Sequence, residues 1–154
     1  KIIMINDKER ELIKKSWSLV EPMADSVPDL FYKRLFELEP AYRDLFPENM
    51  DKQKRKLIKM LGFIVKAIDF SENSWKGTVS EDDDLFLVIL AMGRRHSDIY
   101  KIPDDSYDTV GAALIWTLDY GLGQAFTDEV KAAWVHYYQL LSMTMKMGSA
   151  MVPK

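Results

Sequence analysis

The sequence predicts a single all-α domain, and three observations favour it. Its 154 residues suit one domain and are few for two. Seven glycines and six prolines leave few turn formers, which favours long helices over many short strands. Apolar residues recur at helical spacing along most of the chain, and no segment alternates convincingly as a β-strand does. We therefore expect about six long helices joined by short turns.

The first helix is expected to begin after Asn6 and to end at Pro22. Asn6 and Glu9 have the spacing of a capping box, in which each side chain bonds the backbone N–H of the other residue. The apolar stripe of this helix consists of Ile13, Trp17 and Val20. Proline ends the helix because it has no backbone N–H and its ring clashes with the preceding turn.

A second helix is expected to end before Pro40, with Pro28 near its first turn, where proline is tolerated. Its apolar stripe consists of Phe31, Leu35 and Leu38. Pro40 then opens a short turn that leads to Phe46 and Pro47.

A third helix is expected from about Met50, followed by a polar loop over residues 71–84. The stripe of the third helix consists of Leu57, Leu61, Ile64 and Ile68. The loop ends in the acidic run 81–84, whose charges favour the start of a further helix through the helix dipole. That helix breaks at Pro103, and its stripe consists of Leu85, Val88, Ile89, Met92 and His96.

Two more helices complete the predicted domain. The first of them is expected to end at Gly121 or Gly123, and its stripe consists of Tyr107, Val110, Leu114 and Leu118. Thr127 is expected to cap the last helix, with Asp128 and Glu129 in its first turn. The stripe of the last helix consists of Val130, Trp134, Tyr137, Leu141 and Met145.

Composition excludes several classes of function. The chain has no cysteine, which rules out a disulfide scaffold, a cysteine nucleophile, a thiolate zinc site and a cysteine-ligated iron–sulfur cluster, and fits a cytoplasmic location. A formal net charge of -3 argues against nucleic acid as a partner. The longest apolar run, residues 85–92, is far shorter than the roughly 20 residues of a membrane span. There is no glycine-rich phosphate loop and no nucleophile elbow.

The chain has two histidines, and only His96 lies on an apolar stripe. His96 is either an interior side chain satisfied by a hydrogen bond or an axial ligand of a metal cofactor. His136 is expected at the surface, between Trp134 and Tyr137. One inward histidine is enough for haem, because the porphyrin supplies four of the iron ligands. An all-α fold with a single inward histidine favours a planar cofactor between helices over hydrolysis.

Four polar residues have both a structural and a functional interpretation. Gln53 shares a helix face with Leu57, and is either a surface residue at a helix start or an amide at a pocket rim. The Tyr32 hydroxyl either meets a backbone carbonyl or reaches a pocket as a donor. Lys56 and Arg95 lie either on solvated faces or beside a pocket mouth, where they neutralise a cofactor carboxylate.

Together these residues resemble a globin, over about residues 8–147. The spacing of Pro40 and Phe46 resembles the turn after the second globin helix, whose phenylalanine packs against haem. Tyr32 matches the distal position of that second helix, and Gln53 with Leu57 resembles the distal pair of the E helix. The segment 92–96 resembles the end of the F helix, with His96 as the proximal ligand.

The Tyr32 and Gln53 combination is similar to bacterial single-domain haemoglobins of the flavohaemoglobin and neuroglobin-like branches. This resemblance implies a three-over-three helical sandwich in which the D helix is absent or reduced. It implies one globin domain over residues 1–154, with a core of about 8–147 and residues 1–6 as an N-terminal extension.

The resemblance also implies a function, the reversible binding of O2, NO or CO at haem b, whose iron His96 holds. Tyr32 and Gln53 would donate to the gas and Phe46 and Leu57 would line the pocket, while Lys56 and Arg95 are candidates for the haem propionates. Tyr107 matches a proximal tyrosine that in flavohaemoglobins joins the histidine and a glutamate. Residues 146–149, where that glutamate is expected, contain no acid.

The role of the bound gas has alternatives. These are oxygen transport, detoxification of nitric oxide by an NO dioxygenase that needs an external reductase, and a haem-based gas or redox sensor module. We expect a monomer or a weak homodimer.

Overall fold

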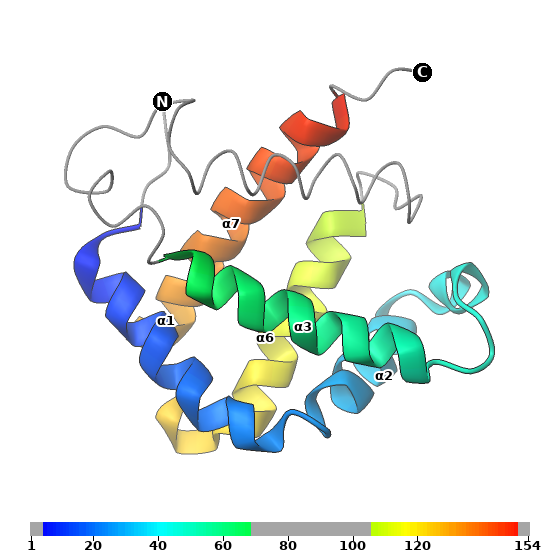
Figure 1. Cartoon of the computed structure of the whole chain (residues 1–154), viewed down its shortest axis with the longest axis horizontal. Helices are drawn as coiled ribbons and strands as arrows, with labels where there is room; N and C mark the ends of the chain where they lie inside the picture. The colour runs from blue at the N-terminus through cyan, green and yellow to red at the C-terminus, as the bar shows by residue number, and fades with distance from the viewer. Residues whose placement is uncertain (1–4, 69–105, 151–154) are drawn as a thin grey trace.

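The computed structural model of the chain describes residues 5–68 and 106–150 (Figure 1). The predicted loop 71–84 and the predicted helix that carries Arg95 and His96 lie outside the described residues. The described α-helices are α1 (Asp7–Val20), α2 (Val27–Leu38), α3 (Asp51–Ala67), α6 (Ser106–Leu122) and α7 (Asp128–Ala150). Short 3-10 turns occupy Glu21–Met23, Pro40–Leu45 and Gly123–Ala125. These ranges contain no strand, so the described part of the chain has the all-α class that the sequence predicts.

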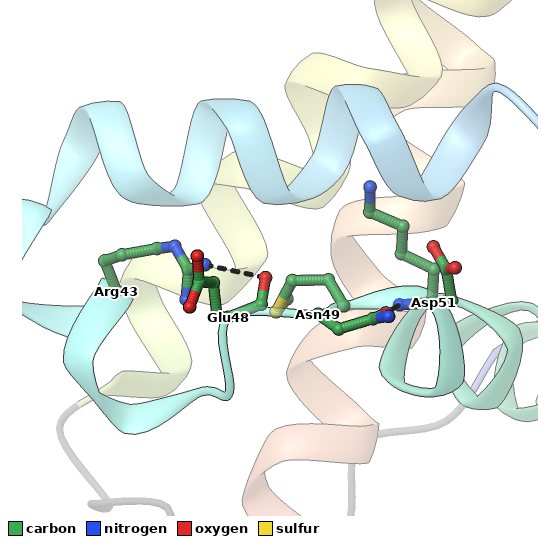
Figure 2. Close-up of a pocket in the computed structure, with 6 residues that line it drawn as sticks. Arg43, Glu48, Asn49 and Asp51 are labelled. Carbon is green, nitrogen blue, oxygen red and sulfur yellow. Dashed lines mark hydrogen bonds between the residues drawn. The ribbon is translucent and has the colours of Figure 1, made fainter.

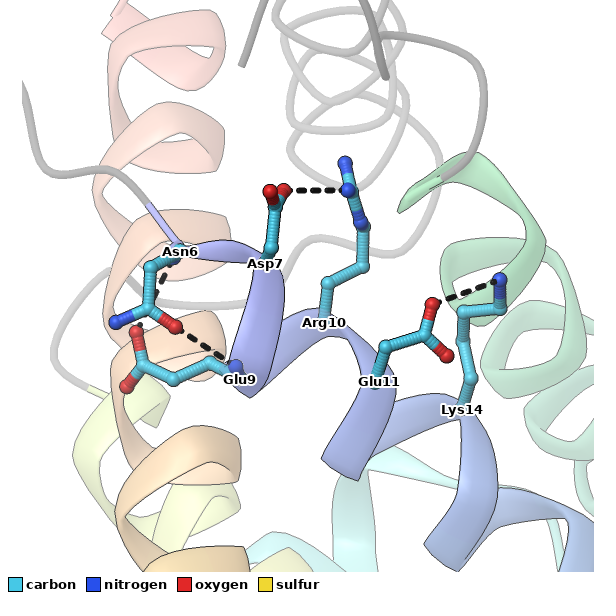
Figure 3. A network of polar contacts seen from close by, with 6 residues as sticks. All are labelled: Asn6, Asp7, Glu9, Arg10, Glu11 and Lys14. Carbon is cyan, nitrogen blue, oxygen red and sulfur yellow. Dashed lines mark hydrogen bonds and ion pairs between the residues drawn. The ribbon is translucent and has the colours of Figure 1, made fainter. Parts of the chain in front are cut away.

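Helix α1 begins and ends where its local sequence requires. The Asn6 side chain accepts from the Glu9 N–H at 2.8 Å, and the Glu9 carboxylate accepts from the Asn6 N–H at 3.3 Å, so the predicted capping box is confirmed. Figure 3 shows this cap beside the Asp7–Arg10 ion pair, which begins in the same first turn. The helix stops at Val20, and Pro22 lies in the 3-10 turn that follows.

Helix α2 is bounded by prolines on both sides, as predicted. Pro28 lies in its first turn, and the helix ends at Leu38, before Pro40. Phe31 and Leu35 are buried, but Leu38 is 38% exposed because it lies in the last turn, beyond the packed part of the stripe. After the turn Pro40–Leu45, residues 46–50 form no helix, which matches the expectation that a D helix is absent or reduced.

The core is made of the predicted apolar stripes. The largest fully buried side chains in the described residues are Trp134, Tyr137, Ile13, Ile68, Leu118, Val20 and Thr117. Helix α6 packs most closely on α2, α7 packs on α1, and α3 lies against α2 and α1. Figure 1 shows α3 in front, with α6 and α7 passing behind it.

Three polar contacts join α7 to α1 in addition to this apolar packing. The Trp134 indole N–H donates to the Ser16 hydroxyl oxygen at 2.8 Å in the interior. At the surface, His136 Nδ1 lies 2.5 Å from a Glu9 carboxylate oxygen, and Lys8 pairs with Glu129. The first and last described helices therefore form one unit, on which α3 and α6 pack, and α2 packs in turn on α6 and α3.

Within residues 5–68 and 106–150, no helix combines the length and the apolar composition that crossing a membrane requires.

Candidate functional site

The structure brings Tyr32 and Gln53 together across the contact between α2 and α3. The Gln53 amide nitrogen donates to the Tyr32 phenol oxygen at 3.2 Å. Tyr32 is 6% exposed, whereas Gln53 is half-buried at the start of α3. This contact uses a lone pair of the phenol oxygen, because the amide is the donor.

Phenylalanine side chains hold the Tyr32 ring in place. The ring centroid of Tyr32 lies 5.0 Å from that of Phe31, 5.6 Å from Phe46 and 6.0 Å from Phe36. The Phe31 and Phe46 contacts are edge-on, a geometry that aromatic pairs prefer. Sequence reasoning missed Phe36. Its signal was the i, i+4 spacing from Tyr32, which places both rings on one helix face.

The apolar side of the site comes from α3. Leu57 and Leu61 are buried in the main core and follow Gln53 along one face of the helix. Gln53 therefore lies at the polar edge of an apolar stripe, as the sequence predicts. Lys56 is exposed, whereas Lys54 turns toward α2 and pairs with Asp29 at 2.8 Å. Sequence reasoning did not single out this lysine, because it belongs to the basic run at residues 52–59, several of which are exposed.

An open hollow of about 640 Å³ lies at the same end of α3 as Gln53 (Figure 2). Its lining residues are Arg43, Glu48, Asn49, Met50, Asp51 and Lys54. The Arg43 guanidinium donates to the carbonyl oxygens of Phe46, Pro47 and Glu48, which fixes the turn between α2 and α3. The two cationic side chains of this lining, Arg43 and Lys54, are thus bonded to protein groups, and the hollow is lined mainly by polar side chains at the start of α3.

Tyr107 is buried in the first turn of α6, with 7% of its surface exposed. Its carbonyl oxygen accepts from the Tyr138 hydroxyl of α7 at 2.5 Å. Burial raises the pKa of Tyr138, and the nearby Tyr107 and Asp108 raise that pKa further, while a hydrogen bond from the Gly111 backbone lowers it. No local sequence signal pointed to the Tyr138 contact, since it joins two helices far apart in the chain.

Tyr137, the residue next to Tyr138, makes a similar contact with a different helix. Its hydroxyl donates to the Ile64 carbonyl oxygen near the end of α3. The Tyr137 side chain is fully buried, and burial raises its pKa. Two consecutive tyrosines of α7 are therefore each bonded to the backbone of another helix.

His136 lies at the surface, as predicted, with its side chain 53% exposed and next to Glu9. His96 and Arg95 lie outside the described residues. Within the two described ranges, no group of histidine, aspartate and glutamate side chains is arranged to hold a metal ion by itself.

Comparisons with known proteins agree with this architecture. Neuroglobin-1 of Oncorhynchus mykiss is 29% identical, over 95% of this chain and 93% of the relative. Neuroglobin of Danio rerio is 28% identical over the same shares. A protein of Brassica napus named as an anaerobic nitrite reductase is 28% identical, over 94% of this chain and 91% of the relative. A family model described as Globin matches residues 29–145. The chain therefore belongs to the globin family, whose members bind haem with its iron and diatomic gas ligands.

Proposed function

We propose that this globin reversibly binds O2, or another diatomic gas, at haem b, with Tyr32 and Gln53 on the gas side. The observation that carries the proposal is the hydrogen bond between these two residues at a buried, aromatic-lined position. The neuroglobin relatives favour the neuroglobin-like part of the predicted branch. Membership of a bacterial or flavohaemoglobin branch remains a prediction from the Tyr32 and Gln53 pair.

The described residues fit haem. The face of α3 that carries Leu57 is apolar, and Phe46 adds an aromatic ring beside Tyr32. Such a wall suits a flat, largely apolar cofactor, and two neutral polar groups at its edge suit a small polar ligand. When bound, haem supplies the iron to which a diatomic gas attaches.

We assign the iron-ligating role to His96. An imidazole nitrogen is the protein ligand in haem sites of this kind. The chain has two histidines, and His136 is turned to the surface against Glu9. Tyr107 is proposed to lie on the same side of the cofactor as His96. Arg95 and Lys56 are proposed for the haem propionates, and the exposure of Lys56 suits a carboxylate at the edge of the cofactor.

The distal residues would act through hydrogen bonds to the partly negative gas. Gln53 orients the Tyr32 phenol, and the Tyr32 hydroxyl and the second amide hydrogen of Gln53 are the proposed donors. Each neutral hydrogen bond contributes about 0.5–1.5 kcal/mol net. Two donors would therefore slow O2 loss by about one to two decades, since about 1.4 kcal/mol is tenfold. CO is less polar and gains less.

The second candidate function is NO dioxygenation. One molecule of NO, one of O2 and one electron from an external reductase would combine to give one nitrate ion. The relative from Brassica napus that is named as a nitrite reductase, similar over nearly its whole length, favours redox chemistry on nitrogen oxides as the alternative. Consumption of NO that continues only while a reductase is supplied would establish this activity.

Absorption spectra and ligand kinetics test the primary proposal. The ferric, ferrous and CO-bound spectra of the wild type should show a Soret band that His96→Ala weakens or shifts. Tyr32→Phe should speed O2 dissociation more than tenfold and CO dissociation less. Tyr120→Phe is the matched control, because Tyr120 is 67% exposed on α6. An O2 rate unchanged by Tyr32→Phe rejects that donor, and haem held equally well by His96→Ala rejects the site.

A further inference from the structure

The Tyr138 side chain occupies a space that only a glycine leaves open. A Cβ added to Gly111 would lie 2.6 Å from Tyr138 Cε2 and 3.0 Å from Cδ2. Glycine is unfavourable inside a helix relative to alanine. Gly111 therefore has a packing role in α6, which is to let the Tyr138 ring lie against the helix backbone.

The Tyr138 side chain contacts both ends of one helical turn. Its hydroxyl donates to the Tyr107 carbonyl oxygen at 2.5 Å, and its ring lies against Gly111, where an added Cβ would meet Tyr138 Cε2 at 2.6 Å. Tyr107 and Gly111 are four residues apart, which is the spacing of bonded pairs in an α-helix. A single side chain of α7 thus fixes the first turn of α6.

That turn determines where the Tyr107 side chain points. Tyr107 is 7% exposed, so its ring lies in the interior rather than in solvent. The backbone of Tyr107 is held through its carbonyl oxygen, and its ring direction follows from the backbone of this first turn.

We propose that Tyr138 is a positioning residue for the iron-ligand side of the pocket, acting through Tyr107. This inference rests on the proposed function, in which Tyr107 lies on the His96 side of haem. Tyr138 itself touches neither haem nor gas in this proposal. Its hydroxyl and its ring, seated on Gly111, hold Tyr107 in one orientation, and loss of the hydroxyl would let that orientation relax.

The matched control is Tyr137→Phe. Tyr137 is the neighbouring residue, is also buried, and also donates its hydroxyl to a backbone carbonyl, but that carbonyl belongs to Ile64 of α3. Both Tyr137→Phe and Tyr138→Phe keep the ring and remove one hydroxyl. A general loss of stability would follow from either variant, whereas an effect on Tyr107 should follow only from Tyr138→Phe.

The experiment compares the full chain, with haem added, as wild type, Tyr138→Phe, Tyr137→Phe, Tyr107→Phe and the Tyr107→Phe/Tyr138→Phe double variant. The readout is the iron–imidazole stretching band of the ferrous form in resonance Raman spectra. Tyr138→Phe should shift this band in the same direction as Tyr107→Phe, and the double variant should shift it no further. Tyr137→Phe should leave the band in place.

A second readout uses the chain without haem. Hydrogen exchange at the Gly111 amide should be about tenfold faster in Tyr138→Phe, because the first turn of α6 loses the stabilisation of the Tyr138–Tyr107 hydrogen bond, and unchanged in Tyr137→Phe. If Tyr138→Phe does not fold, Gly111→Ala displaces the ring while keeping the hydroxyl and should shift the Raman band in the same way.

A band that Tyr138→Phe leaves in place overturns the inference, as does a band that Tyr107→Phe does not move. An equal shift in Tyr137→Phe also overturns it, because the effect would then be general. A wild-type chain without the band, or a band that persists in His96→Ala, overturns the proposed function. In that case the amide exchange still decides separately whether Tyr138 holds the turn of α6.

Discussion

The Tyr32 phenol oxygen accepts a hydrogen bond from the Gln53 amide at 3.2 Å, although the two residues lie 21 positions apart on different helices. A substitution at either residue therefore changes the other. Loss of the amide removes the group that orients the phenol, and loss of the phenol removes the acceptor of the amide.

The first prediction is that Tyr32→Phe and Gln53→Leu act non-additively on O2 dissociation. In the double variant, the effect should fall short of the sum of the single effects by about 0.5–1.5 kcal/mol, the net value of one hydrogen bond. Stopped-flow rates for the four proteins of the cycle give this coupling. Tyr120→Phe combined with Gln53→Leu should be additive, and additivity of the Tyr32 pair would contradict the prediction.

The second prediction concerns two helical glycines that respond oppositely to alanine. A Cβ on Gly62 meets no atom of the described residues within 4 Å, so Gly62→Ala should stabilise α3 by about 0.5–1 kcal/mol. A Cβ on Gly111 meets the Tyr138 ring at 2.6 Å, so Gly111→Ala should destabilise by about 1–3 kcal/mol. Urea midpoints measure both effects. Changes in stability of the same sign for the two variants would be incompatible with this packing.

The third prediction is a loss of stability in alkali that depends on Tyr137. Burial raises the pKa of Tyr137 above its ordinary value of 10.0, so the unfolded chain gives up this proton first. Below pH 10 the contribution of the buried, neutral Tyr137 to the free energy of unfolding is fully present. Above it the unfolded state binds fewer protons than the folded state, so stability falls by up to about 1.4 kcal/mol per pH unit for each such tyrosine. Urea unfolding from pH 9 to 11 should show a shallower fall for Tyr137→Phe, and an identical slope would contradict the prediction.

The fourth prediction concerns the buried bond between α1 and α7. Ser16→Ala removes the acceptor of the Trp134 indole N–H and should cost about 1–3 kcal/mol, because the buried donor is left unpaired. Ser18→Ala is the control, since the Ser18 hydroxyl bonds Lys15 at the surface, and it should change stability by less than about 0.5 kcal/mol. Thermal unfolding of both variants gives the comparison, and similar costs would show that this indole bond has little net value.

Local sequence signals predicted the helix boundaries because each signal acts within one turn. The Asn6 and Glu9 cap, Pro28 at a helix start and Pro40 after a helix end are all confirmed. Leu38 shows that helical periodicity alone does not predict burial. Periodicity continues to the last residue of a helix, but packing does not, and this leucine is exposed.

The candidate site was only partly predictable, for a physical reason. Tyr32 and Gln53 stood out because a polar residue on or beside an apolar stripe is unusual. Tyr138 and Lys54 did not, because a tyrosine or a lysine at helical spacing is common and each acquires its role from a partner on another helix. Which lysine of the basic run faces α2 depends on how α3 is rotated, and that rotation is set by tertiary packing.

The two neighbouring tyrosines of α7 have a consequence for how this helix is seated. Consecutive helical residues diverge by about 100° around the axis, so Tyr137 and Tyr138 reach α3 and α6 in two different directions. Turning α7 about its own axis would break both bonds at once, and sliding it lengthwise would do the same. The two hydrogen bonds thus fix both the rotation of α7 about its axis and its position along that axis. Only one rotation of α7 satisfies the contacts with both α3 and α6.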